Sequence, residues 1–185
     1  IAPFYWEIGD KTGTLDSGSA GDGSVTASTA MAIASASKWI FSSWVLQHLN
    51  TSAQTPLTPD QIQKLNFTSG YENLSTASCL SSADTVDACL TKSDNDTQTT
   101  TDIGKFDYNG GHMQQLAHDL GLGGDYINSV ATAGNTPKLN ADIESDVAAL
   151  QGQGTNFIYT NALLSGGVYT TAAIYAGFLR AILND

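Results

Sequence analysis

Ser35 and Lys38 stand three positions apart in the segment Ser35-Ala36-Ser37-Lys38, and this spacing has a chemical use. If a helix begins here, positions i and i+3 share one face, so the hydroxyl and the amine lie near enough to exchange a proton. Apolar neighbours would desolvate the amine and disfavour its charged form, which makes Lys38 a base for the Ser35 hydroxyl. The pair predicts nucleophilic catalysis by Ser35. Alone it is a weak signal, because two common residue types meet at this spacing by chance.

The element that must hold this pair is a helix that begins near Ser35 and continues to about Leu49. Its apolar residues occupy nearly every face rather than one stripe, which predicts a central, buried helix. These residues are Ala36, Trp39, Ile40, Phe41, Trp44, Val45, Leu46 and Leu49. We interpret Trp39, and Met113 further along the chain, as core residues rather than as parts of a ligand cage.

Strands are predicted before this helix and mainly helices after it. Residues 4–8 and 14–16 predict a β-hairpin around the turn residues 9–13, followed by a flexible Gly/Ser stretch over 17–24. Further helices are predicted after a cap at 58–61 and over 111–120, 142–150 and 172–183. The remaining segments are predicted to be a loop over 75–102, a brief extended piece at 158–159 and a helix cap over 166–171.

Composition and charge exclude several classes of protein. A chain of 185 residues with 41% hydrophobic residues can bury one sizeable core. The net charge of -11 would repel a nucleic-acid backbone or an anionic membrane surface. The longest apolar stretch, 172–183, is too short for a membrane span and contains Arg180. We therefore expect no nucleic-acid partner and no membrane span.

Two cysteines, Cys79 and Cys89, lie in a segment rich in Ser, Thr and Asp. Their spacing suits a local disulfide better than a zinc site, with two free thiols as the alternative. The chain begins at Ile1 with no charged and apolar leader, so we expect that a signal peptide has been removed. Together with the low charge and the acidic balance, these features favour an exported protein, either secreted or periplasmic.

Four segments of the chain match known motifs in one order: Ile33-Ala34-Ser35-Ala36-Ser37-Lys38, Leu65-Asn66-Phe67-Thr68-Ser69-Gly70-Tyr71, Gly104-Lys105-Phe106-Asp107-Tyr108-Asn109-Gly110 and Gly166-Gly167-Val168-Tyr169-Thr170-Thr171-Ala172. They resemble the nucleophile segment, a Thr-Ser-Gly turn, a Phe-x-Tyr segment and a helix entry of the β-lactamase and penicillin-binding-protein family of serine hydrolases. The resemblance is nearest to the class C β-lactamases with their esterase and D-aminopeptidase relatives. It covers nearly the whole chain, and four segments are more specific together than any one alone.

The resemblance implies roles for three side chains. Ser35 would be the acylated nucleophile, Lys38 the group that activates it, and Tyr108 the phenolic acid and base that serves Ser35 and the leaving group. The family's Tyr-x-Asn pattern would place Asn at position 110, where this chain has Gly110 and carries Asn109 one position earlier. Either Asn109 contacts the substrate through a shifted loop at Gly110, or that contact is absent. The alternative for Tyr108 is a packed loop aromatic with a hydrogen-bonded hydroxyl.

The resemblance also implies a fold and a partner. The fold would be α/β (α+β), with an antiparallel sheet flanked by helices plus a helical lobe. Residues 1–30 would form N-terminal strands, 31–165 the nucleophile helix and the helical lobe, and 166–185 a helix that returns to the α/β lobe. The family's Lys-Thr-Gly or His-x-Gly triplet follows the last segment and is missing here, and Lys11-Thr12-Gly13 is interpreted as hairpin turn chemistry. We expect the C-terminal strands on a companion chain produced by cleavage of a precursor.

No metal site and no cofactor are predicted. The histidines share no metal-ligand spacing, and we interpret His48 as a satisfied core or edge residue and His112 as a surface residue at a helix start. Residues 94–96 hint at a calcium loop, but Thr99 stands where that loop needs Gly and Lys105 where it needs Glu.

The sequence therefore predicts a serine hydrolase that cleaves an ester or amide bond of a small-molecule or peptide-like substrate through an acyl-enzyme on Ser35. Two alternatives remain open. One is a non-catalytic member of the same fold that serves as a binding or regulatory module. The other is a penicillin-recognising peptidase of the cell wall.

Overall fold

A β-hairpin opens the chain in the computed structural model, which describes residues 1–82, 85–127 and 138–184. Strands β1 (Phe4–Asp10) and β2 (Gly13–Ala20) pair antiparallel, and the Asp10 carboxylate accepts hydrogen bonds from the backbone N–H groups of Thr12 and Gly13 in the turn. The predicted hairpin is confirmed. The flexible stretch predicted from residue 17 is wrong for its first part, because residues 17–20 pair with β1 as the end of β2.

A second sheet contains three short strands in the order β3-β5-β4, all antiparallel. These are β3 (Ala30–Ala32), β4 (Phe157–Tyr159) and β5 (Val168–Thr171). The extended piece predicted at 158–159 is part of β4. The segment 166–171 predicted to cap the closing helix does end in a cap, because the Thr171 hydroxyl accepts from the Ile174 N–H at 3.3 Å. The strand within the segment was not predicted: Val168–Thr171 form the central strand β5, which is paired along both edges and largely buried.

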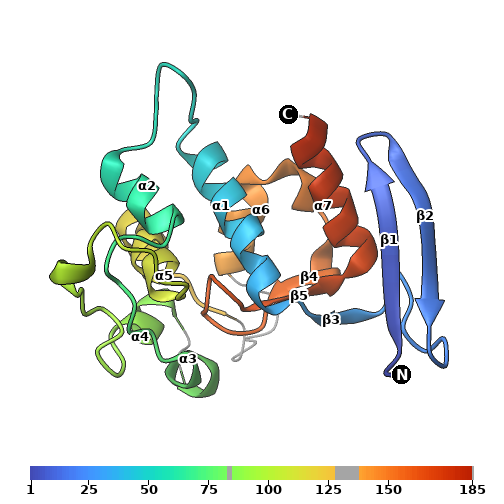
Figure 1. Cartoon of the computed structure of the whole chain (residues 1–185), viewed down its shortest axis with the longest axis horizontal. Coiled ribbons are helices and arrows are strands. Elements are labelled where there is room, and N and C mark those ends of the chain that lie inside the picture. Colours follow the sequence, from blue (N-terminus) through green and yellow to red (C-terminus); the bar gives the residue numbers. More distant parts are fainter. Residues whose placement is uncertain (83–84, 128–137, 185) are drawn as a thin grey trace.

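Helix α1 (Ser37–His48) follows a single 3-10 turn over Ala34–Ala36, close to the predicted helix start. It buries Ile40, Phe41, Trp44 and Val45 in the core. The prediction of burial on nearly every face is wrong for Trp39 and Leu46, which are exposed. The helix lies between the sheet and the helical lobe and packs against α6 (Lys138–Asp146) (Figure 1).

The helical lobe lies on the side of α1 away from the hairpin (Figure 1). It contains α2 (Pro59–Leu65), α3 (Thr76–Ser82), α4 (Val86–Leu90) and α5 (Gly111–Ala117), which continues as a π-helical turn over His118–Leu122. The predicted cap of α2 is a capping box between Thr58 and Gln61. The loop predicted over 75–102 is wrong, because α3 and α4 lie within it. The predicted disulfide between Cys79 and Cys89 joins these two short helices.

Helix α7 (Ala172–Asn184) closes the described chain, as predicted, and packs against β1 (Figure 1). The last residue of the predicted returning segment, Asp185, lies outside the described residues. Arg180 on α7 forms an ion pair with Glu7 of β1, which ties the helix to the hairpin. Of the helices that the structure describes, none has the length and apolar content needed to cross a membrane. The chain is thus a mixed α/β protein whose described part holds two small antiparallel sheets.

Candidate functional site

The 3-10 turn that carries Ser35 is fixed to the central strand β5. The backbone N–H of Ile33 donates to the Val168 carbonyl at 3.0 Å. The buried Ser37 hydroxyl donates to the Ala34 carbonyl at 2.6 Å and accepts from the Val168 N–H at 3.2 Å. Ala34 has a positive φ of 45°, a conformation that a non-glycine residue adopts only where the surrounding structure holds it. These contacts leave the Ser35 side chain exposed at the start of α1.

Lys38 lies one turn further along and directs its amine back to Ser35. The amine donates to the Ser35 hydroxyl at 3.1 Å and to the Ser165 carbonyl at 3.0 Å. The residue is only 9% exposed. Among the described residues, no carboxylate forms an ion pair with Lys38. An exposed hydroxyl and a buried amine are therefore brought together at the spacing from which the sequence predicted a proton transfer.

Tyr108 comes from the loop before α5 and completes the group. The Lys38 amine lies 4.6 Å from the centre of the Tyr108 ring, within the range of a cation–π contact. A hydrogen bond with Ser35 is the largest cause that holds the pKa of Tyr108 below its ordinary value; burial acts against it, and the charge of Lys38 adds to the lowering. The structure thus brings Ser35, Lys38 and Tyr108 together, although they come from two segments some seventy residues apart in the sequence.

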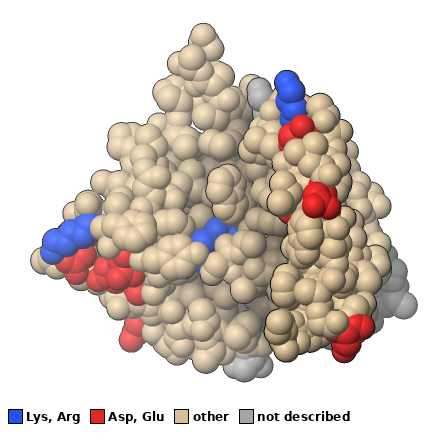
Figure 2. All heavy atoms as spheres, turned by 45° about the vertical axis from the view of Figure 1, so that its right-hand side comes forward, with Lys and Arg blue, Asp and Glu red and all other residues tan. Residues whose placement is uncertain are grey.

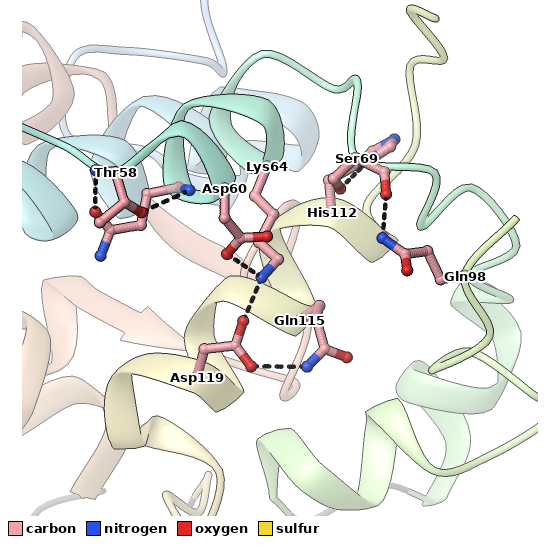
Figure 3. Close-up of polar contacts among 9 residues, drawn as sticks. Thr58, Asp60, Lys64, Ser69, Gln98, His112, Gln115 and Asp119 are labelled. Atoms are coloured by element: carbon pink, nitrogen blue, oxygen red, sulfur yellow. Dashed lines mark hydrogen bonds and ion pairs between the residues drawn. The ribbon is translucent and has the colours of Figure 1, made fainter. Parts of the chain in front are cut away.

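The loop that carries Tyr108 is held by a buried histidine. His112 is fully buried, with 0% of its surface exposed. Burial lowers the pKa of its imidazole, which keeps the ring neutral. Its Nδ1 lies 2.8 Å from the Ser69 hydroxyl (Figure 3). Its Nε2 lies 3.0 Å from the Asp107 carbonyl. A carbonyl only accepts, so Nε2 donates to Asp107 and Nδ1 accepts from Ser69. The prediction of a surface residue is wrong for His112, because α5 begins beneath the residue 67–71 turn.

Phe67 links this support to the site itself. Its ring centre lies 5.2 Å from that of Tyr108 and 5.9 Å from that of His112. The residue 67–71 turn therefore supports the Tyr108 ring in two ways: Phe67 contacts the ring directly, and Ser69 holds His112 by a hydrogen bond. Gln98 adds a further tie, since its amide donates to the Ser69 carbonyl at 2.8 Å (Figure 3).

Asn109 and Gly110 follow Tyr108 and shape the loop through backbone contacts. The Asn109 amide donates to the Glu72 carbonyl at 2.6 Å and accepts from the Gly111 N–H at 3.0 Å. A Cβ atom at Gly110 would lie 2.3 Å from the Ser165 hydroxyl, so a larger residue here would require the Ser165 side chain to move. Both residues line a hollow beside Tyr108. Their contact with substrate stays a prediction, and the visible role of the Asn109 amide is to hold the loop.

Two hollows meet at the three central side chains. One, of about 450 Å³, extends from them toward α1 and α2, and the other, of about 360 Å³, extends toward α3 and the 163–166 loop. Ser35, Lys38 and Tyr108 line both. In Figure 2 a basic side chain is visible at the bottom of a hollow in the middle of the face, surrounded by uncharged residues. A substrate could therefore place a group on either side of the Ser35 hydroxyl.

Sequence reasoning missed three contributors to this arrangement. Ser37 fixes the turn, Ser165 accepts from the Lys38 amine, and Trp39 lines the larger hollow instead of the core. Ser165 directly precedes the Gly-Gly helix entry, but no pattern in the sequence links it to a lysine 127 residues away. Trp39 is adjacent to Lys38, and its exposure follows from the helical rotation that turns Lys38 inward.

Comparisons of the chain with protein-family models, with curated proteins and with solved structures found no match.

Proposed function

We propose that the chain is a serine hydrolase that cleaves an ester or amide bond through an acyl-enzyme on Ser35, of the β-lactamase-like type that its motifs resemble. The observation that carries the proposal is the convergence of three side chains. The Lys38 amine lies 3.1 Å from the Ser35 hydroxyl and 4.6 Å from the Tyr108 ring centre, and the pKa of Tyr108 is lowered. Perturbed phenols and buried amines next to an open hydroxyl are typical of nucleophilic sites.

The first half of the reaction forms the acyl-enzyme. The Tyr108 phenolate takes the proton of the Ser35 hydroxyl, and the Lys38 amine stabilises the negative charge that moves between the two oxygens. The Ser35 oxygen bonds to the carbonyl carbon, and the carbonyl electron pair moves onto its oxygen, which the Ser35 backbone N–H would bind. As the tetrahedral intermediate collapses, the leaving group departs with the proton from Tyr108.

The second half releases the acyl group. Tyr108, again a phenolate, takes a proton from water, and the resulting hydroxide oxygen attacks the acyl carbon. The bond to Ser35 breaks, and the serine oxygen recovers its proton from Tyr108. The exposed position of Ser35 between two hollows supports this step, because water can reach the acyl carbon from one side while the acyl group occupies the other.

The proposal includes a companion chain that completes the sheet and supplies the last family motif. Two features support it: β1 and β2 form a sheet separate from β3-β5-β4, and α7 leaves most of its apolar residues partly exposed. The disulfide supports a secreted or periplasmic location. Mass spectrometry of the mature protein should find two non-identical chains, and a single species without a partner would contradict the companion.

The test of the hydrolase is a matched pair of serine variants on one helix segment. A fluorophosphonate probe should label the wild-type protein, and Ser35→Ala should abolish both labelling and ester turnover. Ser43→Ala, on α1 but outside the two hollows, should label like the wild type. Labelling that persists in Ser35→Ala would remove Ser35 from the role. Labelling by a fluorescent penicillin would instead favour the cell-wall peptidase.

A further inference from the structure

We infer, building on the proposed function, that the ester or amide substrate carries an uncharged apolar substituent, and that the larger hollow binds this substituent with Trp39 as its outer wall. The hollow of about 450 Å³ begins at the Ser35 hydroxyl. Four of its walls are large and apolar: Trp39, Leu65, Phe67 and Met113. A cavity of ~150 Å³ already accepts a benzene ring, so this space holds a ring with a chain or a medium-length alkyl group.

The charge of the hollow selects against ionised substituents. Lys38 is the one charged side chain among the described residues that line it, and two of its amine hydrogens are already donated to Ser35 and Ser165. Beyond the Lys38 amine, which faces the Ser35 hydroxyl at the start of the hollow, the described lining residues offer a substituent carboxylate no cation and a cationic group no carboxylate. Burying either charge without a partner is costly. Ser42 and Asn66, which also line the hollow, offer neutral hydrogen-bonding groups only.

The mouth of the hollow exposes aromatic surface that a ligand would cover. Trp39 is 59% exposed and Tyr108 is 57% exposed, although both are large aromatic residues beside the site. Phe106, two residues before Tyr108, is 68% exposed, and its ring contacts the Phe67 ring edge-on at 6.1 Å between centres. Large apolar side chains grouped at the rim of a concave site mark a binding surface. An apolar substituent that enters the hollow would remove part of the Trp39 surface from water.

The test compares ester chain lengths in a matched pair of tryptophan variants. With 4-nitrophenyl esters, kcat/KM should rise from acetate to butyrate, and 4-nitrophenyl hemisuccinate, which carries a carboxylate, should react about tenfold more slowly than butyrate. Trp39→Ala should lower the butyrate-to-acetate ratio about tenfold, as for removal of an apolar pocket wall. Trp6→Ala, an exposed tryptophan on β1, should leave the ratio unchanged. A parallel series of acetate esters with longer alcohols shows whether the acyl or the alcohol side enters the hollow.

A binding measurement separates this inference from the hydrolase itself. In the Ser35→Ala protein with Trp6→Phe, methyl 4-phenylbutyrate should change the fluorescence of Trp39, and adding Trp39→Phe should remove the response. Binding without any turnover in the wild type would reject the hydrolase and keep the apolar site. Turnover with no chain-length preference in either ester series would overturn the apolar site and keep the hydrolase. Absence of both binding and preference overturns the inference whatever the activity.

Discussion

Two lysines are buried among the residues that the structure describes, and their surroundings are opposite. Lys64 on α2 is 5% exposed and donates to the carboxylates of Asp60 at 2.6 Å and Asp119 at 2.5 Å (Figure 3). Lys38 on α1 is 9% exposed, and its amine donates to a hydroxyl and to a backbone carbonyl. One buried amine is therefore neutralised by two carboxylates, and the other has only neutral acceptors among the described residues.

The difference indicates that Lys64 has a structural role and that Lys38 has a role in the reaction. Burial alone would lower the pKa of Lys64, but its hydrogen bonds with Asp119 and Asp60 outweigh burial and raise it, so this charge is fixed. Lys38 lacks such a partner, and a negative charge that forms beside it is stabilised. Tyr108 is the group that can carry this charge: its hydrogen bond with Ser35 is the main cause that lowers its pKa, and the charge of Lys38 adds to the lowering. A buried amine without a carboxylate partner thus favours an anionic phenol or serine oxygen next to it.

The largest effect is expected from removing the Lys38 amine, which has no carboxylate partner among the described residues. Lys38→Met keeps the length and the apolar stem of the side chain but removes the group that stabilises charge on Ser35 and Tyr108. We expect the rate of Ser35 acylation to fall about 1,000-fold, the range seen when one preorganised electrostatic group is lost. The rate of fluorophosphonate labelling measures this effect, and the circular dichroism spectrum checks that the fold is kept. Labelling of Lys38→Met at the wild-type rate would show that the amine has no chemical role.

The pH dependence of kcat/KM should also distinguish Lys38 from Lys64 through their effects on Tyr108. The reaction needs the phenolate, and the pKa of Tyr108 is lowered, so kcat/KM should rise with pH and level off below the ordinary tyrosine value of about 10. Lys38→Met removes one cause of the lowering, so its rising limb should move to higher pH, whereas Lys64→Met should leave the limb in place. Tyr108→Phe should lose about 100-fold in activity together with the limb. A rising limb that survives in Tyr108→Phe would assign it to another group.

The parts of the fold that could be predicted are those with strong local signals. The hairpin has an aromatic first strand and turn residues around Lys11-Thr12, α2 has its capping box, and α7 is a continuous apolar helix. The strand β5 was not predicted because its burial depends on β3 and β4, which flank it from distant parts of the chain. The short helices α3 and α4 were missed because five to seven residues give too few turns for a periodic pattern.

In the candidate site too, some features could be predicted from local sequence and others depend on packing between elements. The contact between Ser35 and Lys38 follows from helical spacing and could be predicted from the residues alone. Tyr108 was indicated only through a resemblance, because no local pattern says that a loop tyrosine reaches a distant helix. The buried position of His112 and the exposure of Trp39 could not be predicted, since both depend on which side of a helix faces the residue 67–71 turn. Sequence pattern thus gives spacing within an element and not the packing between elements.

The smallest effect is expected at the paired lysine, where it should appear in stability and not in chemistry. Lys64→Met leaves two carboxylates without their cation, but Asp60 and Asp119 are 61% and 34% exposed at their side chains, so water replaces much of the lost interaction. We expect the free energy of unfolding to fall by about 1–2 kcal/mol, less than for a fully buried pair. Adding Asp119→Asn should recover part of the loss. Urea denaturation measures the stability, and fluorophosphonate labelling of the folded protein should proceed at the wild-type rate. If Lys64→Met kept full stability but lost most of its labelling, Lys64 would have a role in the reaction, as proposed for Lys38, and the two lysines would not differ in role.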